Sequence, residues 1–216
     1  MYAEVERLTQ AYGYSPNIIV HCTITGLGCS KIEPGVPAVE NSLKGYSDFV
    51  SKFGSERVVL RCDPIIPVEK FVVHASKNVM DKSIGTRIRF SFLDMYGHVK
   101  QRFLNAGIDS SKLGFTDGNL HVPLEERLRL VDIIKSSIHD PEKLEACGEP
   151  GINSAPCVSK KDCDILGVHY MDPSFSQRFA CHCAANKTEL LGMKGRCKHG
   201  CLYCYWKDQK DYFSGK

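Results

Sequence analysis

The sequence lacks any apolar run long enough to span a membrane. Near Met1 it also lacks the apolar stretch, between a basic segment and small residues, that marks a secretory signal. These two absences predict a cytoplasmic protein with no membrane partner. A strong excess of one charge is absent as well, because 28 Lys and Arg residues against 25 Asp and Glu leave a net charge of +3. This balance permits an anionic partner without demanding one.

Cysteine, by contrast, is abundant. The 216 residues include 11 cysteines. Eight of them lie in the last third of the chain, namely Cys147, Cys157, Cys163, Cys181, Cys183, Cys197, Cys201 and Cys204. In a cytosolic chain, clustered cysteines are more often metal ligands than disulfides. Because Cys147, Cys157 and Cys163 show no motif spacing, we expect them to be ordinary buried thiols.

The last three cysteines form a compact array. Cys197, Cys201 and Cys204 follow the pattern C-x-x-x-C-x-x-C, with the aromatic Tyr203 directly before the third cysteine. An iron–sulfur cluster is usually held by four protein thiolates, so a three-cysteine loop leaves one iron open to another ligand. The alternative is a structural zinc knuckle completed by a nearby Cys or His.

Apolar periodicity predicts alternating strands and helices up to residue 147. The expected strands span residues 18–25, 58–62, 87–93 and, more weakly, 143–147; the expected helices span residues 2–12, 39–53, 71–83, 99–104 and 123–138. Beyond Gly148 the periodicity fades, and we expect an irregular segment held by metal or by packing. The alternation predicts parallel strands in βαβ units, and therefore a barrel or an open doubly wound sheet.

The alternation of side chains within the strands favours the barrel. Each of the first three strands has one apolar and one polar face, although helices cover both faces of an open parallel sheet. In a barrel the polar faces, with His21, Arg61 and Arg89, point into the lumen. We therefore predict an α/β fold, with a partial (β/α) TIM-type barrel over residues 1–147 and a Cys-rich iron–sulfur segment over residues 148–216. An antiparallel sheet with one solvated face is the alternative, which the intervening helices disfavour.

Candidate catalytic residues lie at the end of the second strand. In barrels built from βα units, the active face lies at the carboxyl ends of the strands. Arg61 and Asp63 fall there, and the planar fork of Arg61 suits a carboxylate or a phosphate. A purely structural network around this Arg–Asp pair is an equal alternative.

Three motifs together carry a family resemblance. The cysteine spacing at the chain's end resembles the cluster motif of radical S-adenosylmethionine (SAM) enzymes. Two further segments resemble the middle of spore photoproduct lyase-like (DNA repair photolyase-like) radical enzymes, namely Thr23-x-Thr25-Gly26 with Glu33-Pro34-x-x-Pro37, and Arg61-x-Asp63-Pro64-Ile65-Ile66-Pro67. The whole is similar to a bacterial family of unknown function with its cysteine cluster at the C-terminal end.

This resemblance implies two cofactors and several ligands. Cys197, Cys201 and Cys204 are the implied ligands of a 4Fe–4S cluster, and SAM is the implied second cofactor. The implied cofactor-binding residues are Thr25, Glu33 and Tyr203. Cys181 and Cys183 match a second cysteine pair, which supplies a fourth ligand, binds a separate metal or does neither.

The same resemblance implies partners. It implies that the chain lacks the family's N-terminal portion, so that a separate chain or a second copy completes the barrel. An electron donor and nucleic acid are the other expected partners.

The leading hypothesis is a radical enzyme, in which an electron passes to SAM and the resulting adenosyl radical abstracts hydrogen from a substrate in the polar lumen. One alternative is a non-catalytic zinc module that binds nucleic acid or protein, with a basic tail at Lys207, Lys210 and Lys216. Another is an iron–sulfur electron carrier.

Overall fold

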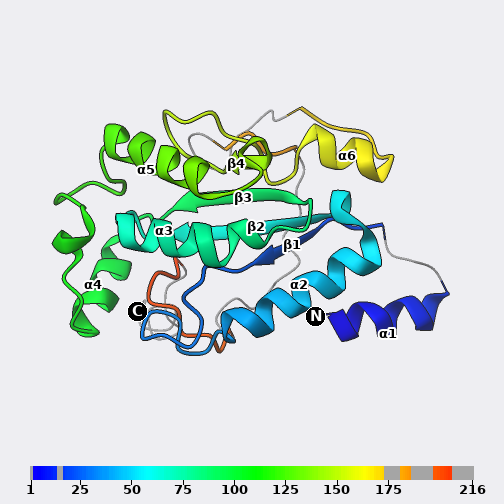
Figure 1. The fold of residues 1–216 in the computed structure, drawn as a ribbon, viewed down its shortest axis with the longest axis horizontal. Helices are drawn as coiled ribbons and strands as arrows, with labels where there is room; N and C mark the ends of the chain where they lie inside the picture. The colour runs from blue at the N-terminus through cyan, green and yellow to red at the C-terminus, as the bar shows by residue number, and fades with distance from the viewer. Residues whose placement is uncertain (1, 14–16, 173–180, 186–196, 206–216) are drawn as a thin grey trace, which may run out of the picture.

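The computed structural model describes residues 2–13, 17–172, 181–185 and 197–205. Strands and helices alternate along most of the chain (Figure 1). The strands are β1 (Val20–Thr23), β2 (Val58–Ile65), β3 (Arg87–Phe92) and β4 (Leu144–Ala146). The α-helices are α1 (Tyr2–Tyr12), α2 (Val39–Phe53), α3 (Glu69–Asn78), α4 (Gly97–Asn105), α5 (Leu124–Ser137) and α6 (Lys160–Leu166). Short 3-10 helices span Ser55–Arg57, Met80–Lys82, Ser110–Leu113 and Pro141–Lys143.

The four strands form one parallel sheet in the order β1-β2-β3-β4. In its register, Cys22 pairs with Leu60, and Leu60 pairs with Ile88. This arrangement confirms the predicted α/β fold with parallel strands. Among the described helices, none is long and apolar enough to cross a membrane.

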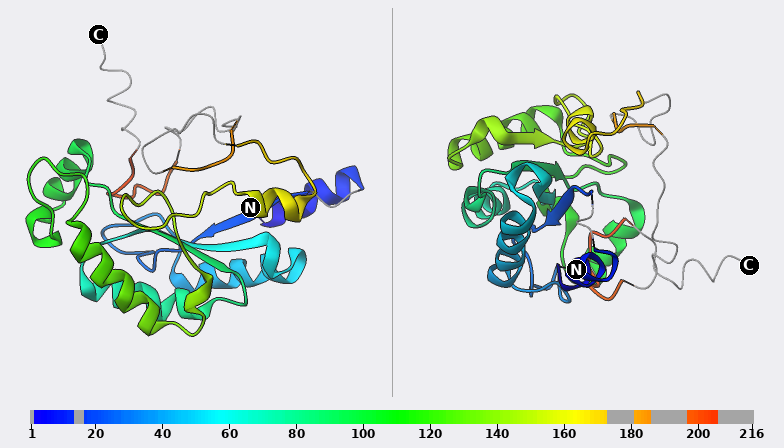
Figure 2. Two further views of the ribbon diagram at one scale, coloured as in Figure 1. Left: turned by 90° about the horizontal axis from the view of Figure 1, so that it is seen from above. Right: turned by 90° about the vertical axis from the view of Figure 1, so that its right-hand side faces the viewer.

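Helices α2, α3 and α5 cover one face of the sheet, as the left view of Figure 2 shows. Leu60 and Ile88 have no exposed surface on this face, and Phe90 is 1% exposed. They belong to the main core with Val72 of α3 and Ile134 of α5. Each such side chain contributes about 1.5–3 kcal/mol by leaving water. The strand face that the sequence assigns to the helices is therefore the one that packs in the main core against them.

Charged side chains occupy the opposite face. Arg89, whose side chain is fully buried, forms an ion pair with Glu145 and donates to the carbonyl oxygen of Cys157 at 3.3 Å. Arg87 pairs with Asp162 at 2.6 Å. The cationic groups on this face therefore meet carboxylates instead of bulk water.

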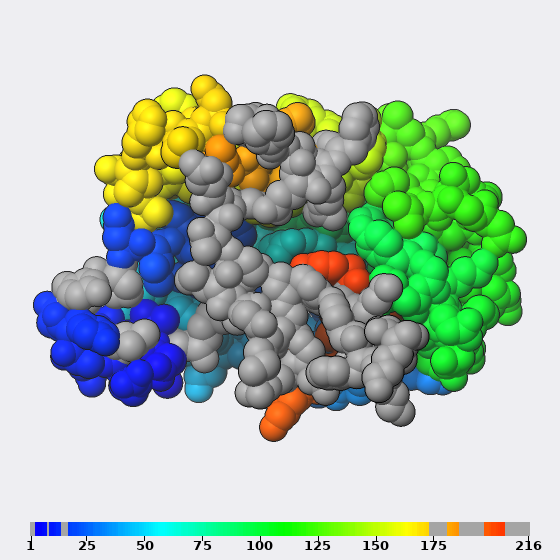
Figure 3. All heavy atoms as spheres, turned by 180° about the vertical axis from the view of Figure 1, so that it is seen from behind, coloured from blue at the N-terminus to red at the C-terminus, as the bar shows by residue number. Residues whose placement is uncertain are grey.

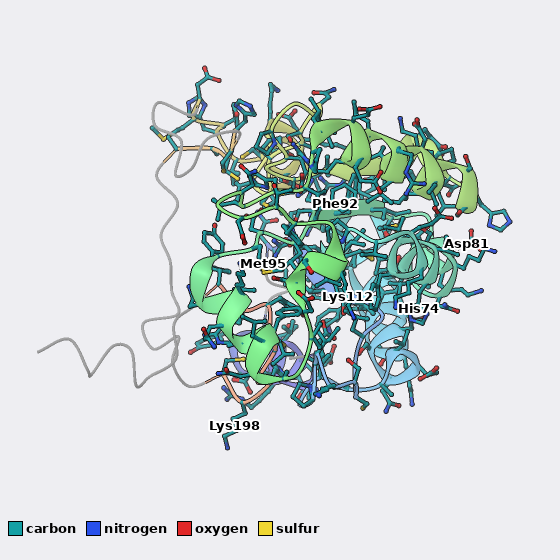
Figure 4. All side chains as sticks on the ribbon, turned by 90° about the vertical axis from the view of Figure 1, so that its left-hand side faces the viewer. His74, Asp81, Phe92, Met95, Lys112 and Lys198 are labelled. Atoms are coloured by element: carbon teal, nitrogen blue, oxygen red, sulfur yellow. The ribbon has the colours of Figure 1, made fainter. Side chains whose placement is uncertain are left out.

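A second apolar cluster lies at the carboxyl ends of the strands, the end from which Figure 4 views the molecule. It packs Leu93, Val99 and Phe103 against Ile32 and Ile66. Partly buried Leu202 and Tyr203 pack against the same cluster. The end of the described chain is thereby attached to the carboxyl edge of the sheet.

One expectation about the segment beyond Gly148 is wrong, because α6 forms there. Ser159 caps this helix reciprocally: its hydroxyl accepts from the backbone N–H of Asp162, and the Asp162 carboxylate accepts from the Ser159 N–H at 2.8 Å. Gly167 then ends the helix at φ +66°. The capping signal Ser-x-x-Asp is readable in the sequence, but seven residues are too few for a clear apolar period.

Other bounds shift by a few residues. The first strand is shorter than predicted, whereas β2 runs on to Ile65; α3 begins at Glu69, earlier than predicted, and ends at Asn78. Closure of the sheet into a barrel stays a prediction. In the described part of the chain, β1 and β4 are the two edges of the sheet.

The polar face predicts a specific acid sensitivity. Burial, followed by the charges of Arg89 and Arg61, lowers the pKa of His21 to about 4, against about 6.5 for an unfolded histidine. Between these two pKa values the unfolded chain binds more protons, so stability falls as the pH drops from about 6.5 to about 4. His21→Gln removes this contribution. In urea unfolding at about pH 7 and pH 5, we expect the wild type to lose about 1–2 kcal/mol more than the variant. Equal losses would contradict the buried, neutral histidine.

Candidate functional site

The cysteine-bearing segment 197–205 folds back onto the loop that follows β1. The Gly35 N–H donates to the His199 carbonyl oxygen at 2.9 Å, and the His199 Nδ1 donates to the Gly35 carbonyl oxygen at 2.7 Å. The Leu202 N–H donates to the Ile32 carbonyl oxygen at 3.0 Å. Figure 4 shows Lys198 of this segment pointing outward from the body. Two backbone hydrogen bonds and one from the His199 ring therefore dock the segment.

Glycine is required at position 35 by this docking. A Cβ atom there would lie 2.7 Å from the Lys198 carbonyl oxygen and 2.8 Å from the His199 Cα, and backbone cannot give way as a flexible side chain can. The Glu33-Pro34-Gly35 stretch is therefore shaped to receive the tail, beyond forming a turn.

A buried carboxylate joins the same two segments. Glu33 is 1% exposed, and its Oε1 accepts from the Thr25 hydroxyl at 2.5 Å and from the Tyr203 hydroxyl. Burial and the Glu33 charge raise the pKa of Tyr203, which therefore remains a protonated donor. The structure thus brings together Thr25, Glu33 and Tyr203, the three predicted cofactor-binding residues. The hydrogen bonds among them hold the tail in place.

The three tail cysteines occupy one short turn. Cys197 is exposed, whereas Cys201 and Cys204 are half-buried. The Cys204 N–H donates to the Cys201 carbonyl oxygen at 3.2 Å, and Arg102 of α4 donates to the Cys204 carbonyl oxygen. Burial raises the pKa of Cys201. Within the described ranges, no group of three or more His, Cys, Asp or Glu side chains is arranged to hold a metal ion.

A cavity of about 570 Å³ lies between the tail and the polar face of the sheet. Arg61, Asp63, Ser91 and Tyr203 contribute to its wall. So do six cysteines, namely Cys147, Cys157, Cys181, Cys183, Cys201 and Cys204. Figure 3 looks onto this side of the molecule, where segments 181–185 and 197–205 are seen in orange and red-orange.

The predicted catalytic pair lies in the cavity wall. Arg61 and Asp63 are two residues apart in β2, so both point to the polar face, where they form an ion pair. The Ser91 hydroxyl also donates to Asp63. The register of β2 against β3 shifts between Cys62 and Ile65, an irregularity of the kind that re-aims side chains beside functional sites. The Nε of Arg61 is buried and has no hydrogen-bond partner among the described residues.

Two cysteines that the sequence did not single out belong to the same wall. The Sγ atoms of Cys147 and Cys157 lie 2.9 Å apart. The hydrogen bond with Cys157 lowers the pKa of Cys147 and raises that of Cys157. Cys157 also contacts Cys183, which contacts Cys181, and the bond to Cys157 together with burial raises the pKa of Cys183 to about 12. Cys147 is buried, as expected of an ordinary thiol, whereas Cys157 is only half-buried, and their contact could not be predicted because their spacing in sequence carries no motif.

Other predicted residues lie apart from the cavity. Thr25 and Glu33 are outside its wall, although Tyr203 links them to it. The basic residues Lys207, Lys210 and Lys216 lie outside the described residues. Cys163 is buried in α6, away from the cavity wall, as an ordinary thiol would be.

Fold and site together define an α/β protein whose C-terminal cysteine segment is docked at the carboxyl edge of a parallel sheet. By sequence, residues 1–206 match the family model DUF1848, described as a domain of unknown function. The chain belongs to this family. No curated protein and no solved structure matches it.

Because the tail backbone lies so close to Gly35, a methyl group added at this position should weaken the docking of residues 197–205. Gly35→Ala places a Cβ against the backbone of the tail and should separate the two segments. We expect the amides of residues 197–205 to exchange with deuterium at least about tenfold faster, as measured by mass spectrometry, because a loss of about 1.4 kcal/mol has this effect.

Gly45→Ala is the matched control. This glycine lies inside α2 with nothing within 4 Å of an added Cβ, so the change should stabilise the helix by up to about 1 kcal/mol and leave tail exchange unchanged. Equal exchange in the wild type and Gly35→Ala would show that the contact does not hold the tail.

Proposed function

We propose that the protein is a radical SAM-type iron–sulfur enzyme. In this proposal Cys197, Cys201 and Cys204 hold a 4Fe–4S cluster, SAM binds next to it, and the substrate enters the polar cavity. The observation that carries the proposal is the meeting of three sequence-distant segments. The strand end with Arg61 and Asp63 and the cysteine tail border one cavity, and the loop with Glu33 is hydrogen-bonded to Tyr203 in the wall of that cavity.

By residue type and spacing, the three tail cysteines suit such a cluster, around which their turn would have to close, because these thiols are not yet arranged as metal ligands in the described ranges. Three thiolates from one turn leave a fourth iron position open, and this turn borders a cavity large enough for a small-molecule cofactor. When bound, the cluster supplies the single electron that splits SAM into methionine and an adenosyl radical.

The sheet topology supports a barrel-type scaffold for this function. Strand order follows chain order, and the crossover helices α2, α3 and α5 lie on one face, whereas α6, which follows the last strand, meets the polar face where Asp162 pairs with Arg87. A doubly wound sheet instead reverses direction and places helices on both faces. If all crossovers run in one direction, the polar face is the inner face of a partial barrel. We propose that a second chain or a second copy completes this barrel.

The residues of the chain take distinct parts in the proposal. Arg61 offers a half-buried guanidinium to the carboxylate of SAM or to an anionic substrate, and its Nε has no hydrogen-bond partner among the described residues. Asp63 orients Arg61, and Ser91 in turn orients Asp63. Glu33 acts through Tyr203 as a positioning residue for the cysteine turn. The likeness to photolyase-like enzymes makes nucleic acid the first substrate class to test, with an external electron donor.

The cluster assignment is tested one cysteine at a time. In anaerobically reconstituted full-length chain, Cys197→Ala, Cys201→Ala and Cys204→Ala should each remove about four iron atoms and their sulfide, because each deletes a ligand. Cys22→Ala, a half-buried cysteine of β1, is the control and should keep its iron. Zinc without sulfide at these three cysteines would favour the non-catalytic zinc module instead.

The enzymatic assignment is tested by product. The reduced, cluster-loaded chain should release 5′-deoxyadenosine from SAM, detected by chromatography. Arg61→Met should raise the KM for SAM by about 10- to 100-fold, because this factor corresponds to the binding free energy lost with one charge-assisted hydrogen bond. Arg129→Met, which changes an exposed arginine of α5, should have no effect. A loaded, reducible cluster that yields no 5′-deoxyadenosine would contradict the enzyme and favour an electron carrier.

A further inference from the structure

Four cysteines on the side of the cavity opposite the tail turn form a group of their own. Cys147, Cys157, Cys183 and Cys181 come from three chain segments, and consecutive members of this order contact one another through their thiols. All four line the cavity. We call Cys147, Cys157, Cys181 and Cys183 the four-thiol group.

Backbone hydrogen bonds hold these segments together without help from the thiols. The Cys147 N–H donates to the Phe90 carbonyl oxygen at 2.8 Å, directly after β4. The Ala155 N–H donates to the Ala146 carbonyl oxygen at 2.7 Å, which brings residues 155–157 beside Cys147. The Ala184 N–H donates to the Val158 carbonyl oxygen at 2.9 Å, which brings Cys183 beside Cys157. The fold therefore brings the thiols side by side, although within the described ranges they are not yet arranged as the ligands of a metal ion.

Two arginines lie near Cys147 and Cys157. Arg61 interacts electrostatically with Cys147 and Cys157, and Arg89 interacts with Cys147. Arg89 also donates to the Cys157 carbonyl oxygen. Four thiolates around a divalent centre leave a net negative charge, and the nearby guanidinium groups of Arg61 and Arg89, which also pair with Asp63 and Glu145, would reduce its cost.

We propose that the four-thiol group is a second metal centre, distinct from the one on the tail cysteines, and that it binds a thiophilic metal as four thiolates. Two such forms exist, a single zinc ion and an iron–sulfur cluster. Sulfurs that share a tetrahedral zinc at about 2.3 Å lie about 3.8 Å apart. The Cys147 and Cys157 sulfurs, at 2.9 Å, separate by about 1 Å to reach this arrangement, and further for a cluster.

The experiment removes the tail centre first. The full chain with Cys197→Ala, Cys201→Ala and Cys204→Ala is purified anaerobically from medium containing zinc and iron. Zinc, iron and acid-labile sulfide are then measured per chain. We expect about one zinc ion, or about four iron atoms with matching sulfide, and either result supports the second centre while identifying its metal.

Single substitutions in this background locate the metal. Cys147→Ala and Cys183→Ala should each lower the retained metal at least about fivefold, because a metal site depends on its full ligand set. Cys163→Ala, a buried cysteine of α6 outside the cavity wall, is the matched control and should retain it.

A misfolded variant would also lose metal, so a second readout uses the triple variant and the wild type without further substitution. Cys147 and Cys157 should resist alkylation until a chelator is added, as followed by mass spectrometry. A folded triple variant without metal, in which both thiols alkylate freely or form a disulfide with each other, would overturn the proposal. Loss of the tail cluster leaves this measurement intact, so the two assignments fail separately.

Discussion

The buried carboxylate of Glu33 is the interaction on which the site depends. It accepts hydrogen bonds from Thr25, near the start of the chain, and from Tyr203, near its end. Without donors, a carboxylate at 1% exposure would bear the full cost of leaving water. With them, it ties the cysteine turn to the loop after β1. The reciprocal hydrogen bonds between Gly35 and His199, one from the Gly35 N–H and one from the His199 ring, set the orientation of that turn. The cavity exists because this closure holds the tail over the sheet.

The second constraint is the division of the sheet into two unlike faces. One face packs Leu60, Ile88 and Phe90 beneath the helices and provides most of the apolar burial. The other carries guanidinium groups, which stability alone does not favour, since a buried ion pair rarely exceeds a hydrophobic contact in net contribution. On this face Arg61 lines the cavity that both sets of cysteines border, and Arg89 lies near Cys147 and Cys157. A stable core and a charged wall are therefore built from alternate residues of the same strands.

The two proposed metal centres share one cavity, and this arrangement bears on how each works. The tail turn is peripheral and partly exposed, with Cys197 at the surface. The four-thiol group lies deeper, and Cys147 and Cys183 are buried. A centre with four protein ligands has no open position and suits a structural or electron-transfer part, whereas a three-cysteine centre leaves room for a ligand. The chemistry that we propose therefore belongs to the tail turn, with the deeper centre as its support.

Much of the molecule is determined locally. Period-2 and period-3.6 patterns specify the strands and most helices, and alternation along β2 and β3 specifies which face meets the helices, because a strand offers only two faces. The C-x-x-x-C-x-x-C spacing needs no fold to be recognised. Tertiary structure decided the rest. Glu33 and Tyr203 meet across 170 residues, and no local period encodes such a contact. Cys147, Cys157 and Cys183 become neighbours because backbone bonds bring separate segments side by side, whereas their spacing along the chain alone resembles that of unrelated buried thiols.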